Sequence, residues 1–215
     1  MRRGSKPKGK VRIQWSSNFA YAIGLLAADG CLSKDGRHID VTSNDYDQLE
    51  NFIKALDIDV KITQKSSGRG YTSWHVQFSD VLFYKFLTEI GITSAKSKTL
   101  RKLDIPDEYF FDFLRGEFDG DGHFYSYWDK RWTNSYMFYL TFIGASQKFL
   151  EWISQTNERL IGIKANVIFC KKSKVYQLRY AKESTLEIIN KMYYTSSALH
   201  LRRKKKKIDA LVVPR

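Results

Sequence analysis

The sequence predicts an α+β protein built from two pseudo-symmetric halves, each with the order α-β-β-α-β-β-α and its own four-stranded antiparallel sheet. Two observations lead to this prediction. A short helix-like pattern that ends in Asp-Gly occurs twice, at residues 22–30 and 114–122. Behind each copy, segments with strand-like alternation and segments with helical periodicity follow in the same order.

The two copies of this pattern share small residues four positions apart. These are Gly24 and Ala28 in the first copy, and Gly116 and Gly120 in the second. Small residues at this spacing remove side-chain bulk from one stripe of a helix, so that two helices can approach backbone to backbone. The sequence therefore predicts that the two halves pack against each other through these helices.

Each of these helices is expected to end at an acid followed by glycine, Asp29-Gly30 and Asp121-Gly122. Glycine at this position is the usual left-handed cap of a helix. An acid in the last turn is unfavourable, because the C-terminal end of the helix dipole is already negative. If the helices pack side by side, the two carboxylates meet at one end, an arrangement that divalent cations would neutralise.

The remaining elements follow from periodicity and turn residues. In the first half, we expect strands at residues 37–42, 61–65 and 71–78, and helices at residues 45–56 and 81–89. In the second half, we expect strands at residues 125–127, 137–142, 166–170 and 175–180, and helices at residues 147–160 and 182–193. The motifs lie 92 positions apart but Leu49 and Leu150 lie 101 apart, which places an insertion of about nine residues in the second half's first hairpin.

These elements divide the chain into four segments. We expect a basic N-terminal arm at 1–12, the first half at 13–98, a linker at 99–108, and the second half at 109–215 with a basic C-terminal run. The net charge of +13 indicates a polyanionic partner. Much of it lies in the arm and in the unbroken run from Arg202 to Lys207. The arm, and only part of the second run, is expected to attract phosphate without sequence preference.

Composition also excludes several classes of protein. No apolar run approaches the length of a transmembrane helix and no signal-peptide pattern is present, so we expect an intracellular protein that neither contacts a membrane nor is secreted. Cys31 and Cys170 form no CxxC pair, and they indicate a reducing compartment without a zinc site.

The duplicated segment resembles the LAGLIDADG motif of homing endonucleases. Against its nine-position pattern, both copies keep the glycine at position three, the acid at position eight and the glycine at position nine. The first copy has Ala27 at position six, where the second copy keeps an acid, Asp119. The family's metal ligand is the acid at position eight, so this departure leaves the predicted metal site complete.

The resemblance implies a site-specific double-stranded DNA endonuclease that works as a monomer on a long, non-palindromic target, in whichever compartment holds the host genome. Asp29 and Asp121, with the carbonyl groups of Ala28 and Gly120, would hold two or three divalent ions. Mg²⁺ is expected, with Mn²⁺ or Ca²⁺ as substitutes for binding. Such ions supply an activated water and neutralise the scissile phosphate. The family also places a basic residue near the end of each half; here the candidates are Lys96, and Arg202 or Arg203.

The resemblance further implies that the outer face of each sheet binds DNA, as a β-ribbon can enter the major groove. In the first half, the candidate DNA-binding residues are Arg37, His38, Asp40, Thr42, Lys61, Thr63, Lys65, Arg69, Tyr71, Ser73, His75 and Gln77. In the second half, they are Tyr125, Tyr127, Arg131, Tyr139, Thr141, Lys171, Lys172, Gln177 and Arg179.

A second interpretation is a DNA- or RNA-binding protein on the same fold, either a transcriptional regulator or an intron maturase. Regulators of this kind tend to lose the motif acids, whereas Asp29 and Asp121 are both present. A maturase could keep them, so RNA binding stays open beside the endonuclease interpretation.

Overall fold

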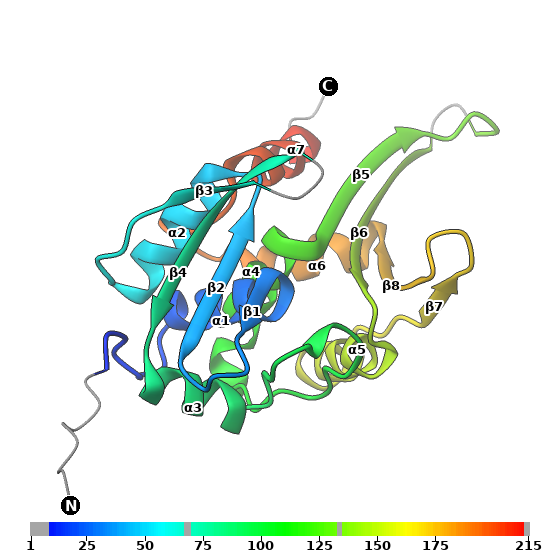
Figure 1. The fold of residues 1–215 in the computed structure, drawn as a ribbon. Helices are drawn as coiled ribbons and strands as arrows, with labels where there is room; N and C mark the ends of the chain where they lie inside the picture. The colour runs from blue at the N-terminus through cyan, green and yellow to red at the C-terminus, as the bar shows by residue number, and fades with distance from the viewer. Residues whose placement is uncertain (1–8, 67–69, 133–134, 213–215) are drawn as a thin grey trace, which may run out of the picture.

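Two four-stranded sheets flank a central pair of helices (Figure 1). The structure, a computed structural model, describes residues 9–66, 70–132 and 135–212. Each half follows the order α-β-β-α-β-β-α, so the predicted α+β fold with two similar halves is confirmed. Among the described helices, none combines the length and the apolar character that a membrane span requires.

The first half begins with the motif helix. Its elements are α1 Ser17–Asp29, β1 Gly30–Leu32, β2 His38–Ser43, α2 Tyr46–Leu56, β3 Thr63–Ser66, β4 Thr72–Ser79 and α3 Val81–Glu89. Ser16 caps α1 by accepting a hydrogen bond from the N–H of Phe19, and Asp80 caps α3 in the same way at Phe83. A short 3₁₀ turn, Lys96–Lys98, follows α3.

The second half repeats this order and adds a helix at its end. Its elements are α4 Phe110–Asp121, β5 Gly122–Trp128, β6 Tyr136–Gly144, α5 Gln147–Ile161, β7 Val167–Cys170, β8 Val175–Ala181, α6 Lys182–Met192 and α7 Arg202–Val212. A 3₁₀ turn, Asp107–Tyr109, leads into α4. Helix α7 lies in the basic run, which the sequence analysis did not assign to a helix.

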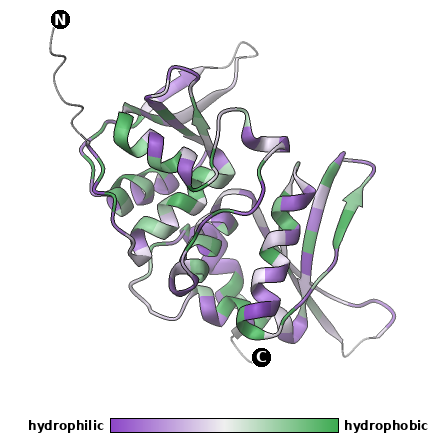
Figure 2. Ribbon diagram, turned by 90° about the horizontal axis from the view of Figure 1, so that it is seen from below, coloured by the Kyte–Doolittle hydropathy of each residue, from purple (hydrophilic) through white to green (hydrophobic). Residues whose placement is uncertain are grey.

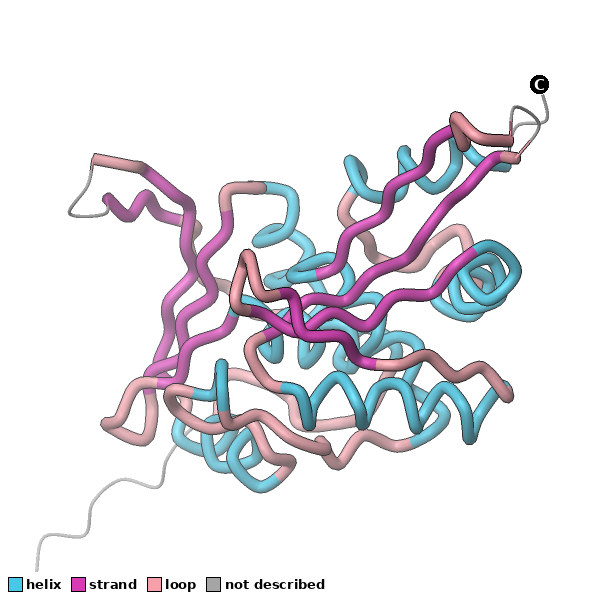
Figure 3. The backbone as a smooth tube through the Cα atoms, turned by 90° about the vertical axis from the view of Figure 1, so that its right-hand side faces the viewer, coloured by secondary structure: helices cyan, strands magenta, loops and turns pink. Residues whose placement is uncertain are grey.

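The strands are antiparallel, in the orders β1-β2-β4-β3 and β5-β6-β8-β7. Equivalent residues pair in the two sheets: Asp40 faces Gln77 in the first, and Thr141 faces Arg179 in the second. In each sheet the helices cover one face, so the alternate residues of each strand form an outer face (Figure 3).

Helix α1 forms the centre of the hydrophobic core. Every residue from Phe19 to Ala27 is buried, because α4, α2 and the first sheet surround this helix. Other helices, such as α2 and α5, are amphipathic: hydrophobic and hydrophilic residues alternate along each of them (Figure 2). A helix that is apolar on all sides belongs in a core, and α1 fits that rule.

The expected insertion in the second half lengthens one hairpin. Strands β5 and β6 have 7 and 9 residues, against 3 and 6 in β1 and β2. The longer hairpin projects away from the helices (Figure 1). The second sheet therefore offers a longer outer face than the first.

Most of the expected basic arm, residues 1–8, lies outside the described residues. At its C-terminal end, the backbone N–H groups of Lys10 and Val11 donate to the Asp80 carboxylate at 2.5 and 2.9 Å, and Val11 is buried. In the expected linker, Leu100, Leu103 and Ile105 are buried in the core. Residues 10–11 are therefore packed against the first half. The segment 99–108 contacts both halves: the N–H of Asp104 donates to the Ile90 carbonyl, and the Ser146 hydroxyl donates to the Leu100 carbonyl.

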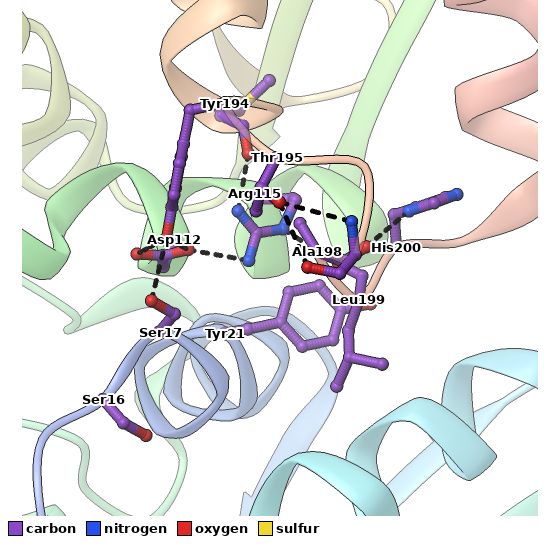
Figure 4. Close-up of polar contacts among 12 residues, drawn as sticks. Ser16, Ser17, Tyr21, Asp112, Arg115, Tyr194, Thr195, Ala198, Leu199 and His200 are labelled. Carbon is purple, nitrogen blue, oxygen red and sulfur yellow. Dashed lines mark hydrogen bonds and ion pairs between the residues drawn. The ribbon is translucent and has the colours of Figure 1, made fainter.

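A buried arginine ties α4 to the C-terminal segment (Figure 4). Arg115 donates to the carbonyls of Leu199 and Met192 at 2.9 and 2.5 Å and to the Asp112 carboxylate at 2.8 Å. Its guanidinium also lies 5.4 Å from the ring centroid of Tyr21 on α1. Arg115 thus joins three segments of the chain and has a structural role.

Candidate active site and nucleic-acid face

The two motif helices cross at Gly24 and Gly116. A Cβ atom added to Gly24 would lie 2.9 Å from the Cα of Gly116, and one added to Gly116 would lie 3.0 Å from the Cα of Gly24. Each would also overlap a backbone carbonyl, that of Phe113 or of Tyr21. The helices therefore pack backbone to backbone, as the spacing of small residues predicted.

The glycines that end these helices differ from the expected left-handed caps. Gly30 and Gly122 are extended, with φ and ψ of −77° and 147° and of −78° and 155°. A Cβ at Gly30 would lie 2.8 Å from the Cα of Leu26, and one at Gly122 would lie 2.6 Å from the Cα of Phe118. Glycine is needed here for space, because the chain turns back across the last helical turn to enter β1 or β5.

This crossing places Asp29 and Asp121 near each other at the C-terminal ends of α1 and α4. Burial raises the pKa of Asp29, and the negative charge of Asp121 raises it further. The Gln48 amide opposes this effect by donating to the Asp29 carboxylate at 2.6 Å. Burial also raises the pKa of Asp121, whose carboxylate accepts no hydrogen bond from the described residues. Both acids are therefore held where a cation would stabilise them.

Two lysines approach the ends of the motif helices in equivalent ways. The Lys96 ammonium donates to the carbonyls of Ala28 and Gly30 at 3.3 and 2.6 Å. The Lys204 ammonium donates to the equivalent carbonyls of Gly120 and Gly122 at 2.9 and 2.7 Å, and to Phe118 at 2.6 Å. Both side chains are buried, and burial lowers the pKa of Lys204 to about 8.

The counterpart of Lys96 is therefore Lys204, which corrects the sequence-based choice of Arg202 or Arg203. Arg203 donates to both carboxylate oxygens of Asp45 at 2.7 Å, and Arg202 lies 3.3 Å from Asp47. Through these ion pairs, the two arginines hold α7 against the start of α2 in the first half. The equivalence was missed because α7 winds the basic run into a helix, so that only one of its side chains points at the motif.

A hollow of about 550 Å³ opens above Asp29. It is lined by Asp29, Thr42, Ser43, Asn44, Asp45, Gln48, Tyr71, Thr72, Ser73, Gly120 and Arg203. The hollow joins the first motif acid to the outer face of the first sheet. A duplex lying on that face could therefore bring a phosphate to the acid. Gln48 was not among the residues predicted from the sequence, because no pattern in the chain marks it.

The oxygen donors at the crossing fit hard divalent cations such as Mg²⁺, which prefer carboxylate and carbonyl ligands. Burial raises the pKa of both Asp29 and Asp121, although the charges of Lys96 and Lys204 oppose this effect. Among the described residues, the carbonyls of Ala28 and Gly120 each accept only the lysine hydrogen bond outside the helix, and a carbonyl oxygen has two lone pairs. No cluster of three or more His, Cys, Asp or Glu side chains suited to a metal occurs in the part of the chain that the structure describes.

Glu117, a buried acid at the crossing, has no equivalent in the first half. Glu117 is 2% exposed, and one of its carboxylate oxygens has no hydrogen-bond partner among the described residues. Burial raises its pKa well above the ordinary value, and the charge of Asp121 adds to this effect. The matching residue of the first half is Leu25, so the two sides of the crossing differ chemically.

On the first sheet, the structure brings several predicted contact residues together on the outer face, among them Thr42, Lys65 and His75. Asp40 is an exception, because its side chain is buried beneath its neighbours and accepts hydrogen bonds from them. Arg37 and His38 both bind Asp35 in the turn before β2. Of the other predicted residues on this side, those with exposed side chains are Lys61, Thr63, Tyr71 and Gln77, and Ser73 is half-buried. Arg69 lies outside the described residues.

On the second sheet, aromatic rings form the outer face. Tyr125 stacks on Tyr139 with ring centroids 5.0 Å apart, and Tyr127 stacks on both. Arg179 lies over the Tyr139 ring at 5.2 Å and donates to the Tyr125 hydroxyl at 3.1 Å. Thr141 corrects the prediction, because it is only 4% exposed and therefore cannot contact DNA in this conformation. The remaining candidates Arg131, Lys171 and Lys172 are exposed, and Gln177 is half-buried.

Known proteins resemble this chain in part of its sequence and in its fold. The sequence model of the LAGLIDADG-like domain matches residues 16–101, the region that holds the first motif and its sheet. Residues 16–101 therefore form a LAGLIDADG-like domain. No curated protein shows significant sequence similarity to this chain.

Solved structures share the fold over most of the chain. The homing endonuclease I-WcaI, bound to its DNA recognition sequence, has a TM-score of 0.61 and 13% identity, over 92% of this chain and 88% of that one. I-DmoI in complex with DNA and Ca has a TM-score of 0.55 and 16% identity, over 91% and 97%. Full-length DUF199/WhiA from Thermatoga maritima has a TM-score of 0.56 and 13% identity. This chain covers 62% of that protein, and 94% of this chain is matched. The LAGLIDADG fold thus occurs both in endonucleases and in WhiA.

Proposed function

We propose that this LAGLIDADG protein is a site-specific endonuclease that hydrolyses phosphodiester bonds of double-stranded DNA. The observation that carries the proposal is the pairing at the helix crossing. Asp29 and Asp121 lie at one end of α1 and α4, each helix end is met by a buried lysine, and the outer faces of two sheets flank the pair. A helix end with a purely structural role would not need a second acid beside it. A surface that only attracts phosphate would not need buried lysines.

Divalent ions held by Asp29, Asp121 and the carbonyls of Ala28 and Gly120 would supply the activated water and neutralise the scissile phosphate. The chain's own residues position these groups. Gln48 fixes the orientation of the Asp29 carboxylate by donating to it. Lys96 and Lys204 hold the carbonyls in place, and their positive charge would draw a phosphate towards the acids. We propose both lysines as catalytic residues.

DNA binding would follow from the outer faces of the sheets. The basic side chains on these faces, such as Lys65 and Arg179, would contact phosphates or bases. Among the structural neighbours, I-WcaI was solved with its DNA recognition sequence and I-DmoI with DNA and Ca. These neighbours support DNA as the ligand and divalent cations as the cofactor of this chain.

A selection from randomised DNA duplexes, with cleavage in Mg²⁺ as the readout, tests the proposal. We expect enrichment of one long, non-palindromic site that is cut in both strands, with no cutting when a chelator removes Mg²⁺. The matched control is the double variant Asp29→Asn/Asp121→Asn, which should bind the selected site without cutting it. Enrichment of a bound site that the wild-type protein never cuts would contradict nuclease activity.

One observation favours the alternative, a nucleic-acid-binding protein without cleavage. The carbonyls expected to ligate metal already accept hydrogen bonds from Lys96 and Lys204, whose charges partly neutralise the acids. A regulator or a maturase would need no more than this. The same selection separates the two functions, and repeating it with RNA hairpins tests for a maturase.

A further inference from the structure

A carboxylate lies at the centre of the outer face that the first sheet would present to DNA. Asp40, in the middle of β2, is 7% exposed. A negative charge here opposes the binding of a polyanion, and its burial is unfavourable unless hydrogen bonds compensate for the lost water. The residue therefore requires an explanation beyond direct DNA contact.

Three side chains from three adjacent strands converge on Asp40. The Thr42 hydroxyl on β2 donates to one carboxylate oxygen at 2.8 Å. The other oxygen lies 2.9 Å from Nδ1 of His75 on β4 and 3.5 Å from the Lys65 ammonium on β3. Strand register supports this cluster, because His75 pairs directly with Thr42 on one side and with Thr63 on the other.

The ionised carboxylate fixes the hydrogen-bonding character of its partners. Burial alone would raise the pKa of Asp40, but the hydrogen bonds from His75 and Thr42 and the charge of Lys65 lower it overall. An ionised carboxylate can only accept, so Nδ1 of His75 must carry a hydrogen. In neutral His75, Nε2 is then left as an acceptor. The Thr42 hydroxyl donates its hydrogen to Asp40, so its oxygen can only accept hydrogen bonds from other groups.

We infer that Asp40 is a positioning residue that makes Thr42 and His75 hydrogen-bond acceptors for exocyclic amino groups in the major groove, with one amino group for each acceptor, because Watson–Crick pairing leaves only one hydrogen of each amino group free. The inference rests on the proposed DNA-binding function. Amino groups in that groove belong to adenine N6 and cytosine N4, whereas guanine and thymine present carbonyl oxygens at the same place. Thr42 also lines the hollow above Asp29, so the base it reads belongs to the inner part of the first half-site.

The second half lacks this arrangement. The residue equivalent to Asp40 is Thr141, and its buried hydroxyl has no partner in the part of the chain that the structure describes. The position equivalent to His75 is Gln177, whose amide both donates and accepts. A change at Asp40 should therefore alter preferences in one half-site only.

The test compares the wild-type protein with Asp40→Asn in a binding selection from randomised duplexes with Ca²⁺ in place of Mg²⁺. Asn can donate as well as accept, so Thr42 and His75 would recover the freedom to donate. We expect the wild-type preference for adenine or cytosine at one or two adjacent inner positions to fall about five- to tenfold, the value of one good base contact. The control Glu50→Gln removes the same charge from an exposed position on α2 and should leave all preferences unchanged.

Two further measurements keep the test decisive. Thr42→Val removes one acceptor but keeps the carboxylate, and it should weaken the preference at one of these base pairs even if Asp40→Asn folds poorly. In the free protein, nitrogen chemical shifts of His75 should show hydrogen on Nδ1, and Asp40→Asn should shift the ring towards the other tautomer.

Hydrogen on Nε2 in the wild-type protein, or equal changes in both half-sites of Asp40→Asn, would overturn the inference. If the preference falls in one half-site only, single-base substitutions at the affected base pair show whether the preferred base is adenine or cytosine. A wild-type protein that binds DNA without any sequence preference would also overturn it. Cleavage of bound DNA is measured separately, so the proposed nuclease activity is judged on its own result.

Discussion

Lys96 and Lys204 are related by the internal symmetry of the chain, and each ammonium bridges two backbone carbonyls across the end of a motif helix. Lys96 bridges Ala28 and Gly30, and Lys204 bridges Gly120 and Gly122. The negative end of each helix dipole is thereby matched by a buried positive charge. This relationship explains how the fold tolerates an acid in the last turn of both helices.

We predict that Lys204→Met slows single-turnover cleavage roughly 100-fold, the usual effect of removing one positioned electrostatic group. Methionine keeps an aliphatic chain against Phe118, over whose ring the ammonium lies at 5.2 Å. The controls are Arg202→Ala and Arg203→Ala, which remove exposed ion pairs and should mainly weaken DNA binding. Thermal melting of each variant separates catalysis from folding. Equal rates for Lys204→Met and the wild-type protein on saturating DNA would refute the assignment of Lys204.

We predict that Gly24→Ala or Gly116→Ala destabilises the protein by about 3 kcal/mol or more, at the upper end for overpacked cores. The added methyl group would meet backbone atoms that cannot rotate away. Gly144→Ala is the matched control, because its new methyl group would lie 3.9 Å from the nearest atoms. Denaturant unfolding gives all three free energies. A crossing glycine that behaved like Gly144 would mean that α1 and α4 do not pack as described.

We predict that Glu117→Gln becomes more stable relative to the wild-type protein as pH rises. The folded-state pKa of Glu117 is raised well above the ordinary value of 4.5. The unfolded chain therefore releases its proton first, and the wild-type protein loses stability as pH rises from that value towards the folded-state pKa. Gln cannot ionise, so this loss should be absent. Urea unfolding of both proteins between pH 4 and 8 checks the trend, and parallel pH profiles would show that Glu117 ionises freely in the fold.

We predict a monomer in solution that prefers a non-palindromic site. The outer face of the first sheet carries the Asp40 cluster, whereas that of the second carries stacked tyrosines and Arg179. Two different faces should read two different half-sites, whereas a symmetric dimer would favour a palindrome. Sedimentation equilibrium with and without target DNA measures the stoichiometry, and two chains on one duplex would rule out this arrangement.

The sequence was sufficient to predict the halves, the order of their elements and the helix crossing. The reason is that the motif spacing and the strand alternation are local patterns that the fold preserves. It was not sufficient to identify Lys204 as the counterpart of Lys96, because six consecutive basic residues look alike until a helix orients their side chains. It also missed the burial of Asp40 and Thr141. Alternation assigns a side chain to a face, but it cannot show that neighbouring side chains cover it.

The central claim is that Asp29 and Asp121 jointly form one metal-dependent cleavage centre. Strand-resolved cleavage of the selected duplex in Mg²⁺ by Asp29→Asn and by Asp121→Asn tests it most directly. We predict that neither variant makes a double-strand break, that any residual nicking is confined to one strand, and that DNA affinity is unchanged or higher because a negative charge near phosphate is gone. Cleavage of both strands at the wild-type rate by either variant would contradict the claim.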